Sequence, residues 1–264
     1  MNVLSLFDGI SCGRVALERS GINVKTYYAC EIEKNAIKVS QMNYPEIIHL
    51  GSVVGLVPPN NIDLLIGGSP CQDLSIAKKE RKGLEGERSG LFWEYIRIKN
   101  ACNPKWFILE NVNSMSKEAK ETITKEMGVE PIMINASLVS AQCRKRLFWT
   151  NIPVKELPED KGILLKDILQ SDGEVDEQMT SKGKAFCLDA SYSKGSSVEH
   201  SIKKKVRTMV KSILGIRKLT PIECERLQGL PDNYTECIAN TNRYKCLGNA
   251  FNVDVVSHIL SYII

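Results

Sequence analysis

Three polar segments of this chain combine residue types that can carry out covalent chemistry. The first, residues 67–72 (GGSPCQ), follows an apolar run and contains a cysteine directly after a proline. Pro70 restricts the local backbone and the glycines permit unusual dihedral angles, which would hold the Cys71 thiolate in one attack geometry. A lone cysteine is more often buried and inert, so the other polar segments decide between the two interpretations.

Two charged segments are placed to serve the same site. Glu110, in the tripeptide ENV, ends an apolar run and supplies a carboxyl group that can act as an acid. Arg144 and Arg146, in the segment QCRKR, precede another apolar run and supply guanidinium groups that can be aimed at the same pocket. Taken singly, such charges are more often structural ion pairs or surface residues. Whether these residues form one site with Cys71 therefore depends on the strands and helices that position them.

A glycine-containing turn near the start of the chain predicts close approach of the backbone to a ligand. Residues 7–13 (FDGISCG) follow an apolar strand and precede a helical pattern. Glu31 ends the next predicted strand, where a carboxylate can accept two hydrogen bonds from a ribose diol. The pair indicates a nucleoside-containing cofactor. These features alone are equally compatible with an enzyme that binds a nicotinamide cofactor. They are also compatible with a site-free protein in which the turn is a tight strand-to-helix connection and Glu31 a surface residue.

Strand-like and helix-like segments alternate along most of the chain. The expected strands are residues 2–7, 26–32, 47–50, 62–66, 106–109, 132–134 and 147–151. The expected helices are residues 14–21, 33–42, 91–101, 118–127 and 252–264, with a further helix opening at Thr220-Pro221. This alternation predicts an α/β fold with a mostly parallel sheet covered on both faces, and ligand sites at the carboxyl ends of its strands.

Composition excludes several classes of protein. The chain has 264 residues, of which 43% are hydrophobic and 25% charged, as expected for one α/β domain with a small insert. No stretch approaches the roughly eighteen apolar residues of a spanning helix, so we expect a cytoplasmic protein without membrane contact. Nine cysteines without a C-x-x-C pair predict reduced thiols and no metal site. The three histidines lie in no catalytic motif, so a nucleophile would work without one.

The pattern changes between residues 153 and 218, where charged sequence with weak periodicity predicts a small second lobe. Residues 178–218 carry ten Lys or Arg against two acidic residues and include the run Lys203-Lys204-Lys205-Val206-Arg207. A basic block of this kind suits contact with phosphates. A solvated surface helix is the equally good alternative for the run taken alone.

In this order the motifs resemble the C5-cytosine DNA methyltransferase family over nearly the whole chain. The matching blocks are LFDGISCG, GGSPCQDLS, ENV, QCRKR, RKLTPIECERLQGLPDNYT and GNAFNVDVV. The segment RKGLEGERSGLFWEYIRI is particularly similar to the animal de novo (Dnmt3-like) branch, here expected in a phage or bacterial enzyme. The resemblance implies a Rossmann-like methyltransferase domain over residues 1–152, a target-recognition lobe over 153–216, and a segment, 217–264, that completes the catalytic domain.

The resemblance also implies a mechanism on double-stranded DNA. Cys71, after Pro70, would add to C6 of a cytosine flipped out of the duplex. Glu110 would contact N3 and the exocyclic amine of the base, and Arg146 would hold its O2. Arg144 would help to position Glu110 and the thiolate side of the pocket.

The implied cofactor is S-adenosylmethionine. Its expected contact residues are Phe7, Asp8, Gly9, Ile10, Ser11, Glu31, Ile32, Ser52, Val53, Leu91, Asn249 and Ala250. Among them, Glu31 is expected on the ribose, and Ile32 and Val53 against adenine. Ser52 stands where the family usually places an aspartate, and a hydroxyl accepts a hydrogen bond more weakly than a carboxylate does.

Two other functions are compatible with parts of this pattern. A transfer RNA methyltransferase would keep the same pocket, but the single proline before Cys71 and the segment CLDASYSKG match that relative poorly. A catalytically silent DNA-binding regulator would not need the intact reactive residues. For DNA contact we expect loops 75–88 and 235–244. Basic candidates in these loops are Lys78, Lys79, Arg81, Lys82 and Arg243.

Overall fold

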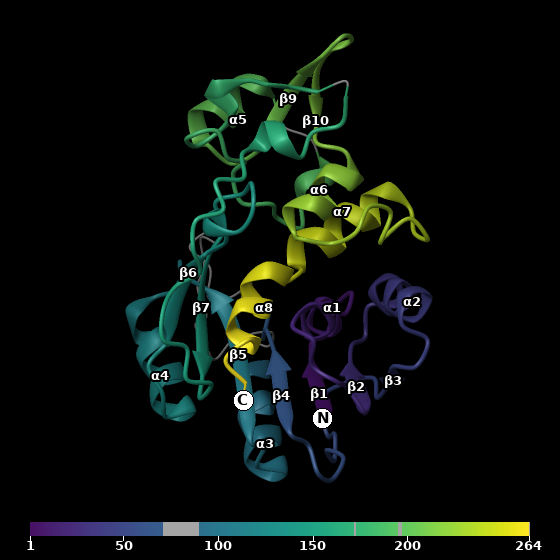
Figure 1. Ribbon diagram of the computed structural model, residues 1–264, viewed down its shortest axis with the longest axis vertical. Coiled ribbons are helices and arrows are strands. Elements are labelled where there is room, and N and C mark those ends of the chain that lie inside the picture. Colours follow the sequence, from purple (N-terminus) through teal and green to yellow (C-terminus); the bar gives the residue numbers. More distant parts are fainter. Residues whose placement is uncertain (71–89, 172, 195–196, 264) are drawn as a thin grey trace.

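A seven-stranded, mainly parallel sheet forms the centre of the larger part of the molecule (Figure 1). The computed structural model describes residues 1–70, 90–171, 173–194 and 197–263. The strands are β1 (Asn2–Leu6), β2 (Thr26–Cys30), β3 (Ile48–His49), β4 (Leu64–Gly67), β5 (Trp106–Val112), β6 (Ile132–Asn135) and β7 (Lys145–Thr150). Their order is β3-β2-β1-β4-β5-β7-β6, and β7 runs antiparallel to both of its neighbours.

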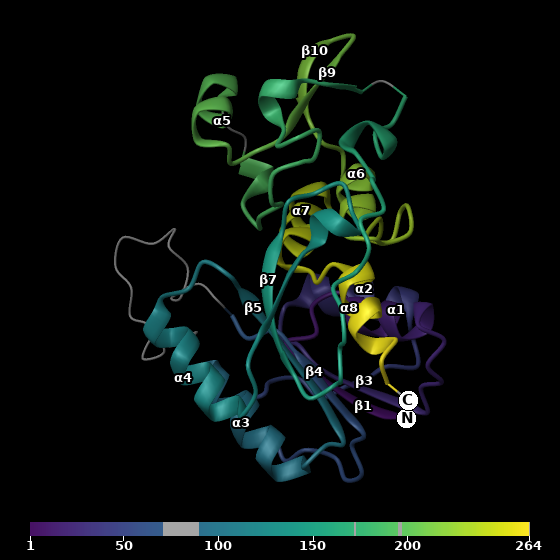
Figure 2. The same ribbon diagram turned by 60° about the vertical axis from the view of Figure 1, so that its left-hand side comes forward.

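Successive strand residues point to opposite faces of this sheet, so each face has its own apolar core. Val3 packs into a core with α1 (Cys12–Arg19), α2 (Lys34–Asn43) and α8 (Val253–Leu260). Its neighbour Leu4 packs into the other core. That second core contains α3 (Leu91–Cys102) and α4 (Lys117–Met127), which lie together on one side of the sheet in Figure 2. The expected α/β fold, with helices on both faces of the sheet, is confirmed.

A smaller lobe lies beyond one end of the sheet, at the top of Figure 1. It contains α5 (Val198–Lys204) and an antiparallel sheet of β8 (Glu174–Val175), β9 (Met209–Ser212) and β10 (Gly215–Lys218). Four short 3-10 helices lie along the chain between β6 and α5. They are η2 (Ala136–Leu138), η3 (Leu165–Asp167), η4 (Glu177–Met179) and η5 (Tyr192–Lys194). Strand β10 continues to Lys218, so the small sheet crosses the expected boundary between residues 216 and 217.

Two helices after the small sheet lie between the lobe and the large sheet (Figure 1). As expected, α6 (Pro221–Leu227) opens after Thr220, whose side-chain oxygen accepts a hydrogen bond from the Glu223 amide at 3.2 Å. The expected loop 235–244 is wrong in its second half, because α7 (Asn240–Asn249) begins within it. Few apolar residues mark this helix and no side chain caps its start, which is why the sequence pattern missed it.

Arg243 packs at the junction between α6 and α7, and its expected contact with DNA stays a prediction. Its side chain is 11% exposed and forms an ion pair of 2.9 Å with the fully buried Glu225. Its Nε donates to Thr235, which is buried as well. The arginine therefore stabilises the junction between α6 and α7. The other basic candidates, with the whole of loop 75–88, lie outside the described residues.

Candidate active site

One cavity of about 390 Å³ lies at the carboxyl edge of the parallel strands. It is lined by residues of both expected sets. From the cofactor set these are Phe7, Gly9, Ile10, Glu31, Ile32, Ser52, Val53, Leu91 and Asn249, and from the catalytic set Pro70, Glu110, Arg144 and Arg146. The antiparallel β7 begins at this same edge, which brings the two arginines beside the end of β5. Of the expected contact residues, Asp8, Ser11 and Ala250 are not part of the cavity wall.

The glycine turn after β1 is held in an unusual conformation. Phe7, Gly9 and Ser11 all have positive φ angles, of 57°, 61° and 61°. Such angles are costly for residues with a Cβ and persist where the surroundings impose them. The carboxylate of Glu31 is part of those surroundings, because it accepts hydrogen bonds from the amides of Gly9, Ile32 and Glu33 at 2.7–2.9 Å. The carboxylate is therefore fixed at the cavity wall.

Asp8 supports this turn from beneath and does not face the cavity. Its carboxyl group accepts hydrogen bonds from the hydroxyls of Ser11 at 2.5 Å and Tyr27 at 2.7 Å. The Ser11 hydroxyl also contacts Ser40. Burial raises the pKa of Asp8, although the hydroxyl hydrogen bonds act in the opposite direction. Asp8 and Ser11 therefore support the turn from beneath, and their expected contact with the cofactor stays a prediction.

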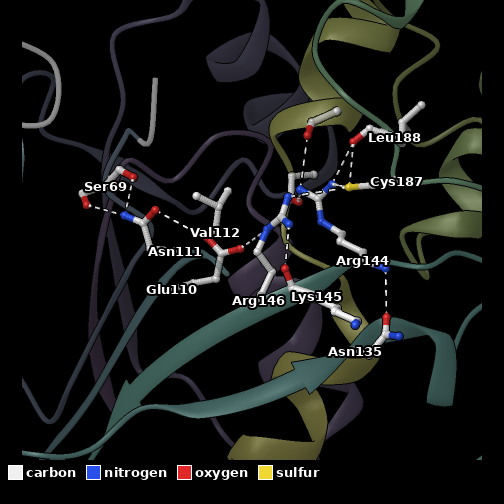
Figure 3. A network of polar contacts seen from close by, with 12 residues as sticks. Ser69, Glu110, Asn111, Val112, Asn135, Arg144, Lys145, Arg146, Cys187 and Leu188 are labelled. Carbon is white, nitrogen blue, oxygen red and sulfur yellow. Dashed lines mark hydrogen bonds and ion pairs between the residues drawn. The ribbon is translucent and has the colours of Figure 1, made fainter. Parts of the chain in front are cut away.

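Glu110 and Arg146 form an ion pair in the cavity wall (Figure 3). Arg146 Nε lies 2.8 Å from Glu110 Oε1, and both side chains are less than one-fifth exposed. The two residues project from adjacent strands, β5 and β7, at neighbouring positions of the register. In a site shielded from water such a pair has a fixed geometry and a strong field.

Arg144 has a different environment from the one expected. Its guanidinium donates to the carbonyl oxygens of Leu188, Gly248 and Ala250 at 2.9, 3.2 and 2.8 Å. These carbonyls belong to the small lobe and to the end of α7, so Arg144 joins three parts of the chain. Burial lowers the pKa of Arg144, and the neighbouring charge of Arg146 acts in the same direction. Its hydrogen bonds join the lobe to the end of α7, and its expected role in positioning Glu110 stays a prediction.

The segment that leads to Cys71 is fixed by β5. The side-chain amide of Asn111 donates to the backbone oxygen and to the hydroxyl of Ser69, at 3.3 and 3.1 Å (Figure 3). A Cβ at Gly68 would lie 2.8 Å from the ring of Phe251, so the chain needs glycine there. Pro70 lines the cavity, and Cys71 itself lies outside the described residues.

The other end of the cavity fits a nucleoside. Ile32 is 73% exposed at its edge and Val53 is buried, which together offer an apolar surface for a flat base. The Ser52 hydroxyl accepts a hydrogen bond from the Val54 amide at 3.1 Å. With the fixed carboxylate of Glu31 for ribose hydroxyls, these groups match the donors and acceptors of S-adenosylmethionine.

Comparison with known proteins agrees with this arrangement. The model of the C-5 cytosine-specific DNA methylase family matches residues 1–159 and 165–264. The chain is 27% identical to the Type II methyltransferase M1.ScrFI of Lactococcus lactis subsp. cremoris, over 97% of this chain and 76% of that protein. It is 28% identical to the Type II methyltransferase M.HpaII of Haemophilus parainfluenzae, over 96% of this chain and 86% of that protein.

The fold is similar to the crystal structure of the S. pombe Dnmt2 methyltransferase, with a TM-score of 0.69 and 16% identity over 99% of this chain and 97% of that one. The chain therefore belongs to the C-5 cytosine-specific DNA methylase family. The expected enzyme class, DNA (cytosine-5)-methyltransferase, and the expected cofactor, S-adenosylmethionine, are confirmed by this membership. The finer similarity to the de novo branch stays a prediction.

Two residues at the site were not singled out from the sequence. Asn111 lies within the ENV motif, but its contact with Ser69 depends on the neighbouring strand. Cys187 contacts both arginines, and no sequence signal marked it. Among the described residues, no group of three or more His, Cys, Asp or Glu side chains is arranged to hold a metal ion. In the same part of the chain, no helix is both long and apolar enough to cross a membrane.

Proposed function

We propose that this enzyme methylates C5 of a cytosine flipped out of a short double-stranded DNA sequence, through a covalent bond between Cys71 and C6 of the base. The observation that carries the proposal is the single cavity that joins the Glu110–Arg146 pair and Pro70 to the residues suited to a nucleoside cofactor. A base buried in a duplex cannot enter such a cavity, which is why the target must leave the stack.

In the proposed reaction the thiolate of Cys71 attacks C6, and the electrons of the C5–C6 double bond shift toward C4 and N3, which leaves an enamine with a nucleophilic C5. Glu110 binds N3 and the exocyclic amine, and Arg146 binds O2, so both stabilise the charge that the attack creates. Asn111 and Pro70 hold the nucleophile's segment in place. Bound S-adenosylmethionine supplies the methyl group for C5. Loss of the C5 proton then restores the double bond and expels the Cys71 thiolate.

We assign the small lobe, residues 153–216, to target recognition, with residues 1–152 and 217–264 as the catalytic part, although the last strand of the lobe continues to Lys218. The lobe carries the exposed lysines Lys203, Lys204 and Lys205, which suit contact with phosphates. A bacterial or phage-infected cell is the proposed location, because the reported relatives are bacterial Type II methyltransferases. The likeness to Dnmt2 is one of fold alone and does not favour an RNA substrate.

The test is bisulfite sequencing of DNA from a methylation-free host that expresses the wild type or Cys71→Ala. We expect 5-methylcytosine at one short motif with the wild type and none with the variant, because alanine cannot add to C6. Cys102→Ala, at the far end of α3, is the matched control and should methylate as the wild type does. Absence of methylation with the wild type would overturn the proposal, and transfer of methyl groups to RNA would then identify the alternative.

A further inference from the structure

A cysteine of the small lobe contacts both arginines of the catalytic domain. The sulfur of Cys187 is 3.5 Å from Arg144 Nη1 and 3.9 Å from Arg146 Nη2 (Figure 3). Its own thiol donates toward the carbonyl oxygen of Leu188 at 3.7 Å. The lone pairs of the sulfur are therefore available to accept from both guanidinium groups.

Cys187 is one of the contacts that orient Arg146. The guanidinium of Arg146 holds Glu110 through Nε at 2.8 Å and the carbonyl of Lys145 through Nη1 at 2.9 Å. Its remaining nitrogen, Nη2, faces the sulfur of Cys187. Because a guanidinium is planar and rigid, a contact at Nη2 constrains the direction in which Nε meets the carboxylate.

The backbone of the lobe holds Cys187 in register with the arginines. Residues 141–143 run beside Ala185, whose amide donates to the Ala141 carbonyl at 2.7 Å. The Ala185 carbonyl in turn accepts from the Cys143 amide at 2.8 Å. Three residues further along, the carbonyl of Leu188 accepts a hydrogen bond from the Arg144 guanidinium. The position of the sulfur is thus set by the contacts between this segment of the lobe and the residues that lead into β7.

We propose that Cys187 is a positioning residue through which the target-recognition lobe orients Arg146, and through it Glu110, for catalysis. The inference rests on the proposed function, since it assigns Cys187 to the methylation of cytosine. A shift of the segment around Cys187 changes the contact at Arg146 Nη2. Correct engagement of DNA by the lobe is thereby linked to the geometry of the group that binds the base.

The test compares Cys187→Ala with Cys187→Ser on DNA that carries the target motif. We expect the alanine variant to lower kcat about 10-fold, because it removes an acceptor from a charged hydrogen-bond donor. The serine variant keeps an acceptor and should recover most of the rate. KM for DNA and the affinity for S-adenosylhomocysteine, measured by calorimetry, should stay within about 2-fold in both variants. Cys102→Ala again serves as the control.

Three results would overturn the inference. One is an alanine variant with the kcat of the wild type. Another is a serine variant as slow as the alanine variant. The third is a loss of kcat that is matched by a loss of S-adenosylhomocysteine binding or of thermal stability, since that pattern indicates damage to the fold. If the wild type itself fails to methylate DNA, the proposed function fails instead, so the two failures are distinguishable.

Discussion

Residues that line the cavity of this enzyme are held in position by buried side chains behind them. Asp8 is buried, and its carboxyl group accepts two hydroxyl hydrogen bonds that support the turn whose residues Phe7, Gly9 and Ile10 line the cavity. The cost of burying this carboxyl group is lowest when it is protonated. Stability should therefore depend on pH through this single side chain.

We expect Asp8 to destabilise the fold increasingly as the pH rises. Its pKa is raised in the folded protein above the ordinary value of 3.8, so the folded state binds the proton more tightly than the unfolded state does. This contribution to stability is fully present below pH 3.8 and is lost as the pH rises through the folded pKa. Asp8→Asn, which resembles the protonated form, removes this dependence. Thermal unfolding of both proteins between pH 4 and pH 9 measures it.

The melting temperature of Asp8→Asn minus that of the wild type should increase as the pH rises. Asp160→Asn, at an exposed position, controls for the loss of one negative charge. A difference between Asp8→Asn and the wild type that stays constant over the whole range would contradict the prediction.

At the scale of elements, short polar signals determine where helices begin. Thr220 and Glu223 form reciprocal hydrogen bonds at the start of α6, with the Thr220 amide donating to the Glu223 carboxylate at 2.8 Å. The Thr220 hydroxyl also donates to the side chain of Gln170 at 2.7 Å. One residue thus caps a helix and ties it to the segment that enters the lobe.

Replacing this cap should cost stability without changing the site. We expect Thr220→Ala to lower the free energy of unfolding by about 1 kcal/mol, because the hydroxyl hydrogen bonds with the Glu223 amide and with the Gln170 side chain are lost. Urea unfolding followed by circular dichroism measures the change. Thr122→Ala, on the exposed side of α4, is the matched control and should change it by less than about 0.5 kcal/mol. Equal effects at the two positions would refute the capping role.

At the scale of the whole molecule, the two lobes share one apolar core. Buried residues of the large sheet, such as Ile108 and Phe148, belong to the same cluster as Leu188 and Val210 of the small lobe. Arg144 adds polar contacts across the same junction. The lobe is thus held in a defined orientation over the carboxyl edge of the sheet, with its basic helix α5 exposed.

Binding of DNA should depend on the charges of that helix. We expect Lys203→Gln with Lys204→Gln to weaken binding of a duplex and to reduce the slope of log K against log salt by about 1.8, if each lysine neutralises one phosphate. Titration of a fluorescent duplex at several salt concentrations measures both quantities.

A control pair tests whether the position of the charges matters. Lys25 and Lys105 are exposed and precede β2 and β5, at the amino edge of the sheet and away from the cavity. Their replacement by glutamine should leave the slope within about 0.3 of the wild type, since only bound phosphates release counterions. The same loss of slope in both pairs would show that net charge alone, and not the lobe, determines binding.

The sequence by itself determined the order of the elements that build the large sheet, the location of the cavity at its carboxyl edge and many of the residues that line it. Apolar periodicity is a local property, and parallel strands necessarily bring their carboxyl ends to one edge, so Glu31, Pro70 and Glu110 could be assigned together. The cap at Thr220 could also be predicted from the sequence, because its two reciprocal hydrogen bonds with Glu223 join residues only three positions apart.

Only the tertiary structure decided which partners these residues have. Arg146 meets Glu110 across two strands, whereas Arg144, two residues away, binds carbonyls from the lobe and from α7. Cys187 and Arg243 likewise gain their contacts from other elements of the chain, Cys187 from Arg146 on β7 and Arg243 from Glu225 on α6. Ion pairs and hydrogen bonds depend on distances of about 3 Å between atoms. Periodicity and motif spacing fix the neighbourhood of a side chain but not the direction in which it points.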